Sequence, residues 1–296
     1  LAGPGGSFEI FSYPWVEENI REATRVPAGT LALTDPPSPE TRLLQTSLIP
    51  NLLIGVDRNV RNFSDFRLFE VGRVFPEGDW RQWNENGEKL PYQPKHVAGM
   101  CVSTCSTKDL FFEVKGMLEG LFQTLHIEPV QLTITTELPA WIASGSGMAI
   151  SSGTEILGHF GVVAPKALRK IGISRVSVCG FEFNFDKLTP KASTEYTYTP
   201  LPRFPRVEYD LSLLFDVSVL WQNIREVALG ASDRVVDVRF IDEYQGEQIP
   251  EGKRSVAFQI TLGDPEATLT SEEAQKVVDK IVRHLGDRFG AKMRDR

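Results

Sequence analysis

The C-terminal third of the sequence alternates between two hydrophobic periods, and this alternation limits the possible folds more than any other feature of the chain. Apolar residues at every second position are typical of a half-buried strand, whereas a spacing of three or four marks one face of a helix. The two periods predict, in order, a strand, a helix, two strands, a helix and a short strand, over residues 207–215, 220–228, 234–244, 255–262, 270–285 and 291–294.

Cap and stop signals agree with this order. Ser218 is a candidate cap for the first helix and Gly230 a candidate stop. Thr270 and Glu273 have the spacing of a capping box, in which each side chain accepts a backbone N–H at the start of a helix. The order βαββαβ is the split βαβ arrangement of ferredoxin-like domains, so we predict that fold here.

The rest of the chain predicts a second, looser α+β domain. Residues 190–205 are rich in proline and lack a hydrophobic period, as expected of a linker. We therefore predict two domains, residues 1–195 and residues 196–296. In the first domain the pattern predicts helices and strands on a mixed or antiparallel sheet. The helices cover residues 46–59 and 110–125, and the strands residues 66–75, 97–102 and 176–185.

Composition is that of an ordinary globular protein, with 41% hydrophobic and 24% charged residues. The 296 residues suffice for two domains. No apolar run approaches the roughly 20 residues of a membrane helix, so we expect no membrane association. The chain lacks an initial Met and an export leader, so we expect it to begin within a longer or trimmed protein and to lie in the cytoplasm.

The sequence offers few groups for metal binding or covalent catalysis. Cys101, Cys105 and Cys179 are too few for a disulfide framework, which suits a reducing compartment. Cys101 and Cys105 lie near His96, but no second Cys or His cluster completes a zinc site, so we predict no metal. Gly145-Ser146-Gly147 lacks the G-x-S-x-G pattern of a nucleophile elbow and is interpreted as a loop. The glycine-rich start, residues 3–6, lacks the G-K-[ST] of a phosphate-binding loop.

Three segments resemble the beta subunit of phenylalanyl-tRNA synthetases. The first is PSPETRLLQTSLIPNLLIGVDRNVRN, residues 37–62, followed by LFEVGRVF, residues 68–75. The second is DLFFEVKGMLEGLF, residues 109–122. The third is the C-terminal third of the chain, with FPRVEYDLSLLFD, VRFIDEYQGEQIPEGKRSVAFQITL and TLTSEEAQKVVDKIVRHLGDRFGAKMR. Departures from the family pattern include Tyr209-Asp210 where Arg-Asp is usual, and Ala143-Ser144 and Ala164-Pro165 where His-Pro is frequent.

The resemblance implies a class II synthetase-like antiparallel sheet domain followed by a ferredoxin-like anticodon-binding domain. It implies a non-catalytic part of phenylalanine–tRNA ligase, with a catalytic alpha subunit as partner in a heterotetramer of two alpha and two beta subunits. It also implies contact with the anticodon region of tRNA(Phe). ATP and Mg²⁺ are implied for the assembled enzyme, and no cofactor for this fragment.

The residues that would activate an amino acid are missing from the matching positions. Class II enzymes carry Arg-x-Glu after the strand that LFEVGRVF resembles, because the transition state needs guanidinium groups against phosphate charge. Here Pro76 follows that strand, and proline has neither charge nor donor. The segment 178–188 likewise lacks the glycine set and Arg of the second signature. We interpret Glu70 and Arg73 as a structural or surface pair rather than as ligands.

RNA contact is expected at the edges and connections of the second domain. If Val236, Val238 and Phe240 share the buried face of the second strand, the opposite face of the sheet has no aromatic residue on which bases could stack. Residues 199–296 hold fourteen Lys and Arg against seventeen Asp and Glu, a net charge of −3, so the grip should be shallow and salt-sensitive. The candidate RNA-binding residues are Arg203, Arg206, Arg239, Tyr244, Lys253, Arg254, Arg288, Lys292 and Arg294.

Two alternative functions remain open at this point. One is an autonomous adenylate-forming ligase, which the missing arginines disfavour. The other is a free-standing RNA-binding or regulatory paralogue of the beta subunit. The net charge of −7 argues against a general nucleic-acid-binding protein, so any RNA contact must be local or shared with another chain.

Overall fold

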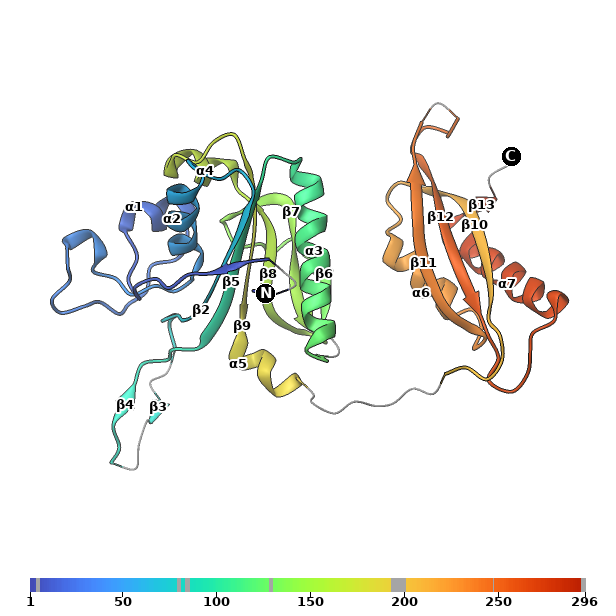
Figure 1. The fold of residues 1–296 in the computed structure, drawn as a ribbon, viewed down its shortest axis with the longest axis horizontal. Coiled ribbons are helices and arrows are strands. Elements are labelled where there is room, and N and C mark those ends of the chain that lie inside the picture. The colour runs from blue at the N-terminus through green and yellow to red at the C-terminus, as the bar shows by residue number, and fades with distance from the viewer. Residues whose placement is uncertain are drawn as a thin grey trace. The chain divides into compact units, whose positions relative to one another are not determined.

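The computed structural model describes residues 1–3, 6–78, 81–82, 86–127, 130–192, 201–246 and 248–293. The chain divides into two compact units, residues 1–196 and residues 197–296 (Figure 1). The predicted boundary between residues 195 and 196 falls in 193–200, which lies outside the described residues.

The first unit is built on a seven-stranded sheet in the order β1-β2-β5-β9-β8-β7-β6. All neighbouring strands are antiparallel except β1 and β2. The strands are β1 (Phe8–Glu9), β2 (Phe66–Arg73), β5 (Lys95–Ser103), β6 (Gln131–Ile134), β7 (Ile142–Ser152), β8 (Glu155–Val163) and β9 (Ser177–Asn184). A separate two-stranded ribbon joins β3 (Arg81–Gln82) and β4 (Lys89–Leu90).

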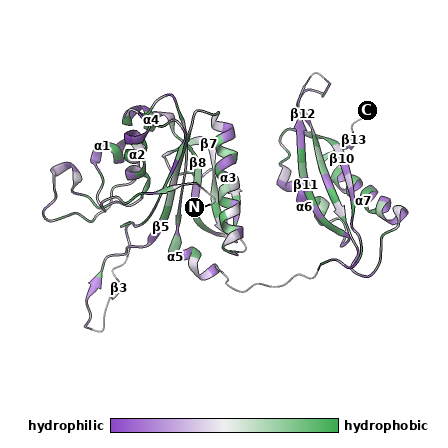
Figure 2. Cartoon of the chain, in the orientation of Figure 1, coloured by the Kyte–Doolittle hydropathy of each residue, from purple (hydrophilic) through white to green (hydrophobic). Residues whose placement is uncertain are grey.

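Helices cover both faces of this sheet. One face carries α3 (Thr107–Thr124), and the other carries α2 (Ile49–Asn59) and α4 (Pro165–Ile171), with α1 (Glu18–Thr24) packed against these two helices. Short helical turns complete the unit as η1 (Pro39–Thr41), α5 (Phe185–Leu188) and η2 (Thr189–Lys191). Figure 2 shows polar and apolar residues together on α3, as expected of a helix with one buried stripe.

The sequence explains why α3 begins and packs where it does. Ser106 accepts the backbone N–H of Asp109 and so caps the first turn. Leu110, Val114 and Leu118 follow at four-residue spacing and are buried against the sheet. The predicted helix over residues 110–125 is confirmed, starting three residues earlier than expected.

The segment Gly145-Ser146-Gly147 was interpreted as a loop, and this was wrong because it lies within β7. Gly147 is needed there because the neighbouring strand approaches closely, and Gly145 has the left-handed backbone conformation that favours glycine. A Cβ at Gly161 of β8 would lie 2.7 Å from the Cα of Gly147 and 2.5 Å from the carbonyl oxygen of Ser146. Local sequence patterns do not reveal such contact between strands.

The second unit confirms the predicted βαββαβ order. Its strands are β10 (Val207–Asp216), β11 (Val235–Tyr244), β12 (Lys253–Leu262) and β13 (Lys292–Met293), in the sheet order β11-β12-β10-β13. Both helices, α6 (Trp221–Leu229) and α7 (Ser271–Phe289), pack on one face of the sheet around a core that includes Phe215, Phe258 and Leu285.

Two of the predicted local features of this unit are confirmed, and two are wrong. Thr270 and Glu273 form the predicted capping box of α7, and Gly230 ends α6. Ser218 does not cap α6, because its hydroxyl donates to Asp216 Oδ1 at 3.0 Å within the preceding turn. Val236 is not in the core: a bulge in β11 buries Val235 instead and leaves Val236 40% exposed.

Candidate nucleic-acid interface

The centre of the seven-stranded sheet is packed solid on both faces. Phe181 of β9 is 1% exposed beneath α3, and Met100 of β5 is fully buried on the face that carries α2. A Cβ at Gly99 would lie 2.5 Å from the Phe181 ring, and one at Gly180 would lie 2.7 Å from Met100 Sδ. Aromatic and sulfur side chains therefore fill the space beside these glycines.

Glu182 of β9, on the same side as Met100, is held by internal contacts. Its carboxylate accepts the hydroxyl of Ser47 at 2.6 Å and the backbone N–H of Leu48 at 2.9 Å. The Nδ1 of His96 lies 3.1 Å from the same carboxylate. Glu182 thus satisfies donors at the start of α2, a structural role that helix N-termini commonly give to acids.

Glu70 and Arg73 of β2 do not form the predicted pair. Glu70 is buried and accepts the backbone N–H and the hydroxyl of Ser12, at 2.9 and 2.7 Å. Burial raises the pKa of the Glu70 carboxyl, and the hydrogen bonds from Ser12 oppose this shift. Arg73 donates to the carbonyl of Gln93 at 3.0 Å. Glu70 thus links β2 to the segment of Ser12, and Arg73 links β2 to the segment of Gln93. Neither residue is the other's partner in these bonds.

Two of the three cysteines, Cys101 and Cys179, are buried, and His159 is partly buried. Cys101 and Cys179 face each other across β5 and β9, and burial raises the pKa of Cys101 to about 12. Burial also raises the pKa of Cys179, so both thiols are poor nucleophiles. His159 of β8 has a pKa lowered by burial, and its Nε2 has no partner within the described structure. Among the described residues no group of three or more His, Cys, Asp or Glu could hold a metal ion.

The sheet of the second unit differs, because the face opposite its helices carries polar side chains. Asp210, Gln259 and Arg239, on three adjacent strands, form a ladder across this open face. Gln259 Nε2 donates to Asp210 Oδ1 at 3.1 Å, and Arg239 Nη2 donates to Gln259 Oε1 at 3.2 Å.

Register places three of the candidate RNA-binding residues at one end of the open face. Lys253 lies opposite Asp216, Lys292 opposite Leu214, and Tyr244 opposite Ser255. The opposite end of β10 carries Glu208 and, before the strand, Arg203 and Arg206. We call the first group the basic end of the open face, defined by Tyr244, Lys253 and Lys292.

Tyr244 was not expected on this face, and the sequence interpretation was wrong here. A second bulge in β11, between Phe240 and Asp242, shifts the alternation by one residue. Tyr244 therefore pairs with Ser255, whose hydroxyl lies 3.0 Å from that of Ser212 on the open face. The Tyr244 side chain is 43% exposed, so the face has an aromatic ring after all.

Arg254 is used inside the unit. Its side chain is 15% exposed, and its guanidinium contacts Glu243 Oε2 and donates to the carbonyl of Val219 at 2.7 Å. It lies opposite Phe215, on the helix side of the sheet. Arg254 therefore fastens the start of α6 to β12, whereas its neighbour Lys253 belongs to the basic end.

The remaining candidates are spread over the unit. The guanidinium of Arg288, on α7, lies 5.7 Å from the centre of the Phe289 ring. Arg206 lies beside Gly263, whose added Cβ would come 3.2 Å from Arg206 Cγ. Arg203 is exposed ahead of β10, and Arg294 lies outside the described residues.

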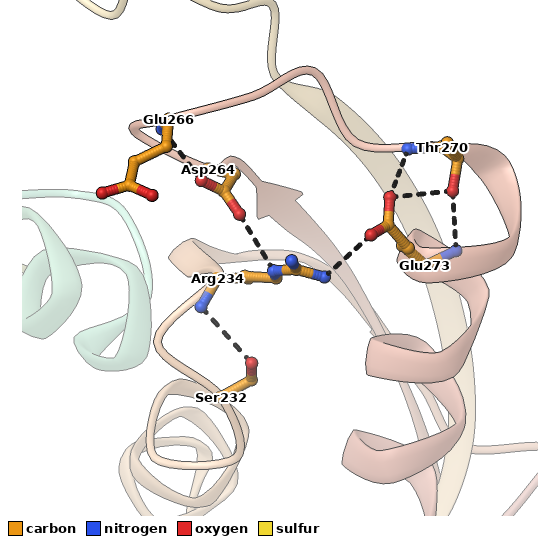
Figure 3. A network of polar contacts seen from close by, with 6 residues as sticks. All are labelled: Ser232, Arg234, Asp264, Glu266, Thr270 and Glu273. Carbon is orange, nitrogen blue, oxygen red and sulfur yellow. Dashed lines mark hydrogen bonds and ion pairs between the residues drawn. The ribbon is translucent and has the colours of Figure 1, made fainter.

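A further arginine, which the sequence analysis did not single out, is neutralised at the end of the unit opposite the basic end. Figure 3 shows Arg234 between two acids: its Nε donates to Asp264 Oδ2 at 3.1 Å, and its Nη1 lies 3.7 Å from Glu273 Oε1. Glu273 also accepts the backbone N–H of Thr270, which lowers the pKa of its carboxyl. Arg234 thus links the start of β11 to the capping box of α7.

Comparison with known proteins identifies the family. Residues 4–185 match the model of the phenylalanyl-tRNA synthetase beta chain CLM domain. This chain belongs to the phenylalanyl-tRNA synthetase beta chain family. Residues 202–294 match the ferredoxin-fold anticodon-binding domain, which agrees with the observed fold of the second unit.

Curated relatives agree with this assignment. The phenylalanine–tRNA ligase beta subunit of Clostridium tetani is 33% identical over 99% of this chain and 36% of its own length. That of Listeria monocytogenes serotype 4b is 30% identical over 93% of this chain and 34% of its own length. The chain therefore spans about a third of the length of these beta subunits. Among solved structures, a pyrrolysyl-tRNA synthetase from Desulfitobacterium hafniense has a TM-score of 0.48 and 14% identity over 62% of each chain.

In the part of the chain that the structure describes, no helix is long and apolar enough to cross a membrane. The α+β class, the largely antiparallel first sheet and the ferredoxin-like second domain are confirmed. A β-bulge has no single-residue signature, so the place of Tyr244 on the open face could not be found from strand parity alone.

Proposed function

We propose that this chain is a non-catalytic part of phenylalanine–tRNA ligase that contacts the anticodon region of tRNA(Phe) through its second unit. The observation that carries the proposal is the basic end of the open face. An exposed aromatic ring can stack on an unpaired base while the two lysines face the RNA backbone. The name of the matched domain supports the same role.

In the proposal, the first unit serves as a scaffold for a catalytic alpha subunit. Several large apolar side chains of this unit are exposed, as expected where a large interface is uncovered. They include Phe8, Phe11, Tyr13, Phe63 and Phe112, of which Phe11 is 84% exposed. The same proposal includes a class II synthetase-like origin of the sheet and two domains at residues 1–195 and 196–296. It also includes a cytoplasmic location and a heterotetramer of two alpha and two beta subunits.

ATP and Mg²⁺ belong to the assembled enzyme in this proposal, because the residues of this chain do not fit a triphosphate. Pro76 stands where an active class II enzyme has an arginine. Gly180 is covered by Met100, and the carboxylate of Glu182 is engaged by Ser47 and Leu48. These groups offer a phosphate no positive charge, so we assign no step of amino-acid activation to this chain.

The test is charge reversal at the basic end of the assembled alpha–beta enzyme. Lys253→Glu with Lys292→Glu should weaken tRNA(Phe) binding by about tenfold or more at low salt and make the salt dependence shallower by about two counterions. Lys276→Glu with Lys280→Glu is the matched control, since these exposed lysines lie on α7 and give the same change in net charge. An affinity unchanged by the first pair across the salt range would reject this surface.

The competing reading is a free-standing RNA-binding or regulatory paralogue. Gel filtration of the chain mixed with the alpha subunit separates the two. Co-elution supports the scaffold role that the exposed aromatic side chains favour, whereas separate elution with retained tRNA binding favours the paralogue.

A further inference from the structure

A groove of about 450 Å³ lies on the second unit between α7 and the outer edge of β10. Its apolar lining comes from β10 and β13 on one side and α7 on the other, and consists of Tyr209, Leu211, Val278, Val282 and Met293. Its rim is polar, with Gln275, Asp279 and Arg283 of α7. The groove is thus an apolar trough bordered by hydrogen-bonding and charged groups.

The groove lies beside the outer edge of β10, next to the place where β13 pairs with that strand. β13 pairs with β10 only at Leu213 and Leu214. Within the described residues, the outer edge of β10 over 207–212 therefore has no strand partner, although its inner edge pairs fully with β12. Backbone N–H and C=O groups on such an edge are free to pair with another extended chain.

The two sides of this edge select different side chains in an added strand. Tyr209 and Leu211 face the groove, while Glu208 and Asp210 lie on the open face. In an added strand, alternate residues would point into the apolar groove, and the residues between them would lie beside the two acids. The complementary sequence is therefore one that alternates apolar and basic residues.

We propose that the outer edge of β10 binds an extended segment of a partner protein by strand addition, with apolar residues in the groove and basic residues beside Glu208 and Asp210. Main-chain hydrogen bonds would supply the affinity and the groove the selectivity for side chains. A single-stranded RNA fits this edge poorly, because its phosphates would meet Glu208, Asp210 and Asp279. The proposal does not depend on the proposed function.

The test uses the full chain and a blocked heptapeptide in which lysine alternates with valine. Binding should slow hydrogen exchange of alternate backbone amides within 207–212 by at least about tenfold at saturation, because outward N–H groups become paired. A peptide with glutamate in place of lysine should bind about tenfold more weakly, and so should one with serine in place of valine. Equal binding of all three peptides, or no protection of these amides, would overturn the proposal.

Variants of the chain test whether the peptide binds in the groove. Val282→Glu, on the groove wall, should abolish the protection, whereas Ser271→Glu adds the same charge at the exposed start of α7 and should leave it unchanged. If Val282→Glu fails to fold, Met293→Ser at a 55% exposed groove residue serves instead. A chain lacking residues 294–296 completes the set. Binding seen only after that deletion, or equal protection by an oligouridine, would contradict the proposal.

Discussion

The two sheets of this chain differ in how many of their faces are covered. The first unit has helices on both faces, and the side chains at the sheet centre are those that fit between layers, such as Phe181 and Met100. The second unit has helices on one face, and the other face carries the polar ladder from Asp210 to Arg239. Packing dictates residues on a covered face, so only the uncovered face is free to be shaped by a ligand.

The charges follow the same division. On the first sheet, Glu70 and Glu182 accept hydrogen bonds from segments of their own unit. On the second sheet, Tyr244, Lys253 and Lys292 collect at one end of the open face. We therefore propose that the RNA-binding surface lies in the second unit and that the first unit has a structural role.

The largest expected effect tests the covered sheet. Phe181→Ala should lower the free energy of unfolding of the first unit by about 3–5 kcal/mol, because a fully buried ring leaves a cavity. Gln259→Ala on the open face should cost the second unit less than about 1 kcal/mol. Urea unfolding followed by hydrogen exchange in each unit measures both. Similar losses at the two positions would break the distinction between covered and uncovered faces.

The next effect separates two neighbouring cations. Arg254→Ala should destabilise the second unit by about 1–3 kcal/mol, because Glu243 and the carbonyl of Val219 lose their partner. Lys253→Ala should change stability by no more than about 0.5 kcal/mol and should weaken tRNA(Phe) binding instead. Thermal unfolding and tRNA titration of the assembled enzyme check the pair. The reverse ranking in both assays would place the RNA-facing charge on Arg254.

A smaller effect concerns the capping box of α7. Thr270→Ala removes the acceptor for the backbone N–H of Glu273 and should cost about 1 kcal/mol. Thr270→Ser keeps the hydroxyl and is the matched control. Denaturant titration followed by circular dichroism should show a lower midpoint for the alanine variant alone. Equal midpoints for both variants would show that the cap contributes nothing.

The smallest effect is a dependence on pH in the first unit. The native pKa of His159 is lowered by burial, so the unfolded chain binds more protons below about pH 6.5. Stability contributed by neutral His159 is thus present above that pH and lost as the pH falls through it. His159→Phe should lose less stability than the wild type between pH 7.5 and 5.5, measured by urea midpoints. An identical loss would mean that His159 is not the titrating group.

The sequence predicted the second unit more fully than the first, because the signals of the second unit lie within single helices and strands. Each element from β10 to α7 carries its own period, cap or stop, such as the Thr270–Glu273 box. The hairpin of β7 and β8 depends on contact between Gly161 and Gly147, which lie on different strands and leave no periodic pattern. The candidate site was limited in the same way. Residue type indicated Lys253 and Arg254 equally, and only their register on opposite sides of the sheet separates them.

The most direct measurement of the central claim is phenylalanine-dependent exchange of pyrophosphate into ATP. The account predicts no exchange above background by the purified chain, and exchange once the catalytic alpha subunit is added to a complete beta subunit. Exchange by the chain alone that requires phenylalanine and follows the protein through purification would contradict the account, because it would show an adenylation site where Pro76 and a filled sheet now stand.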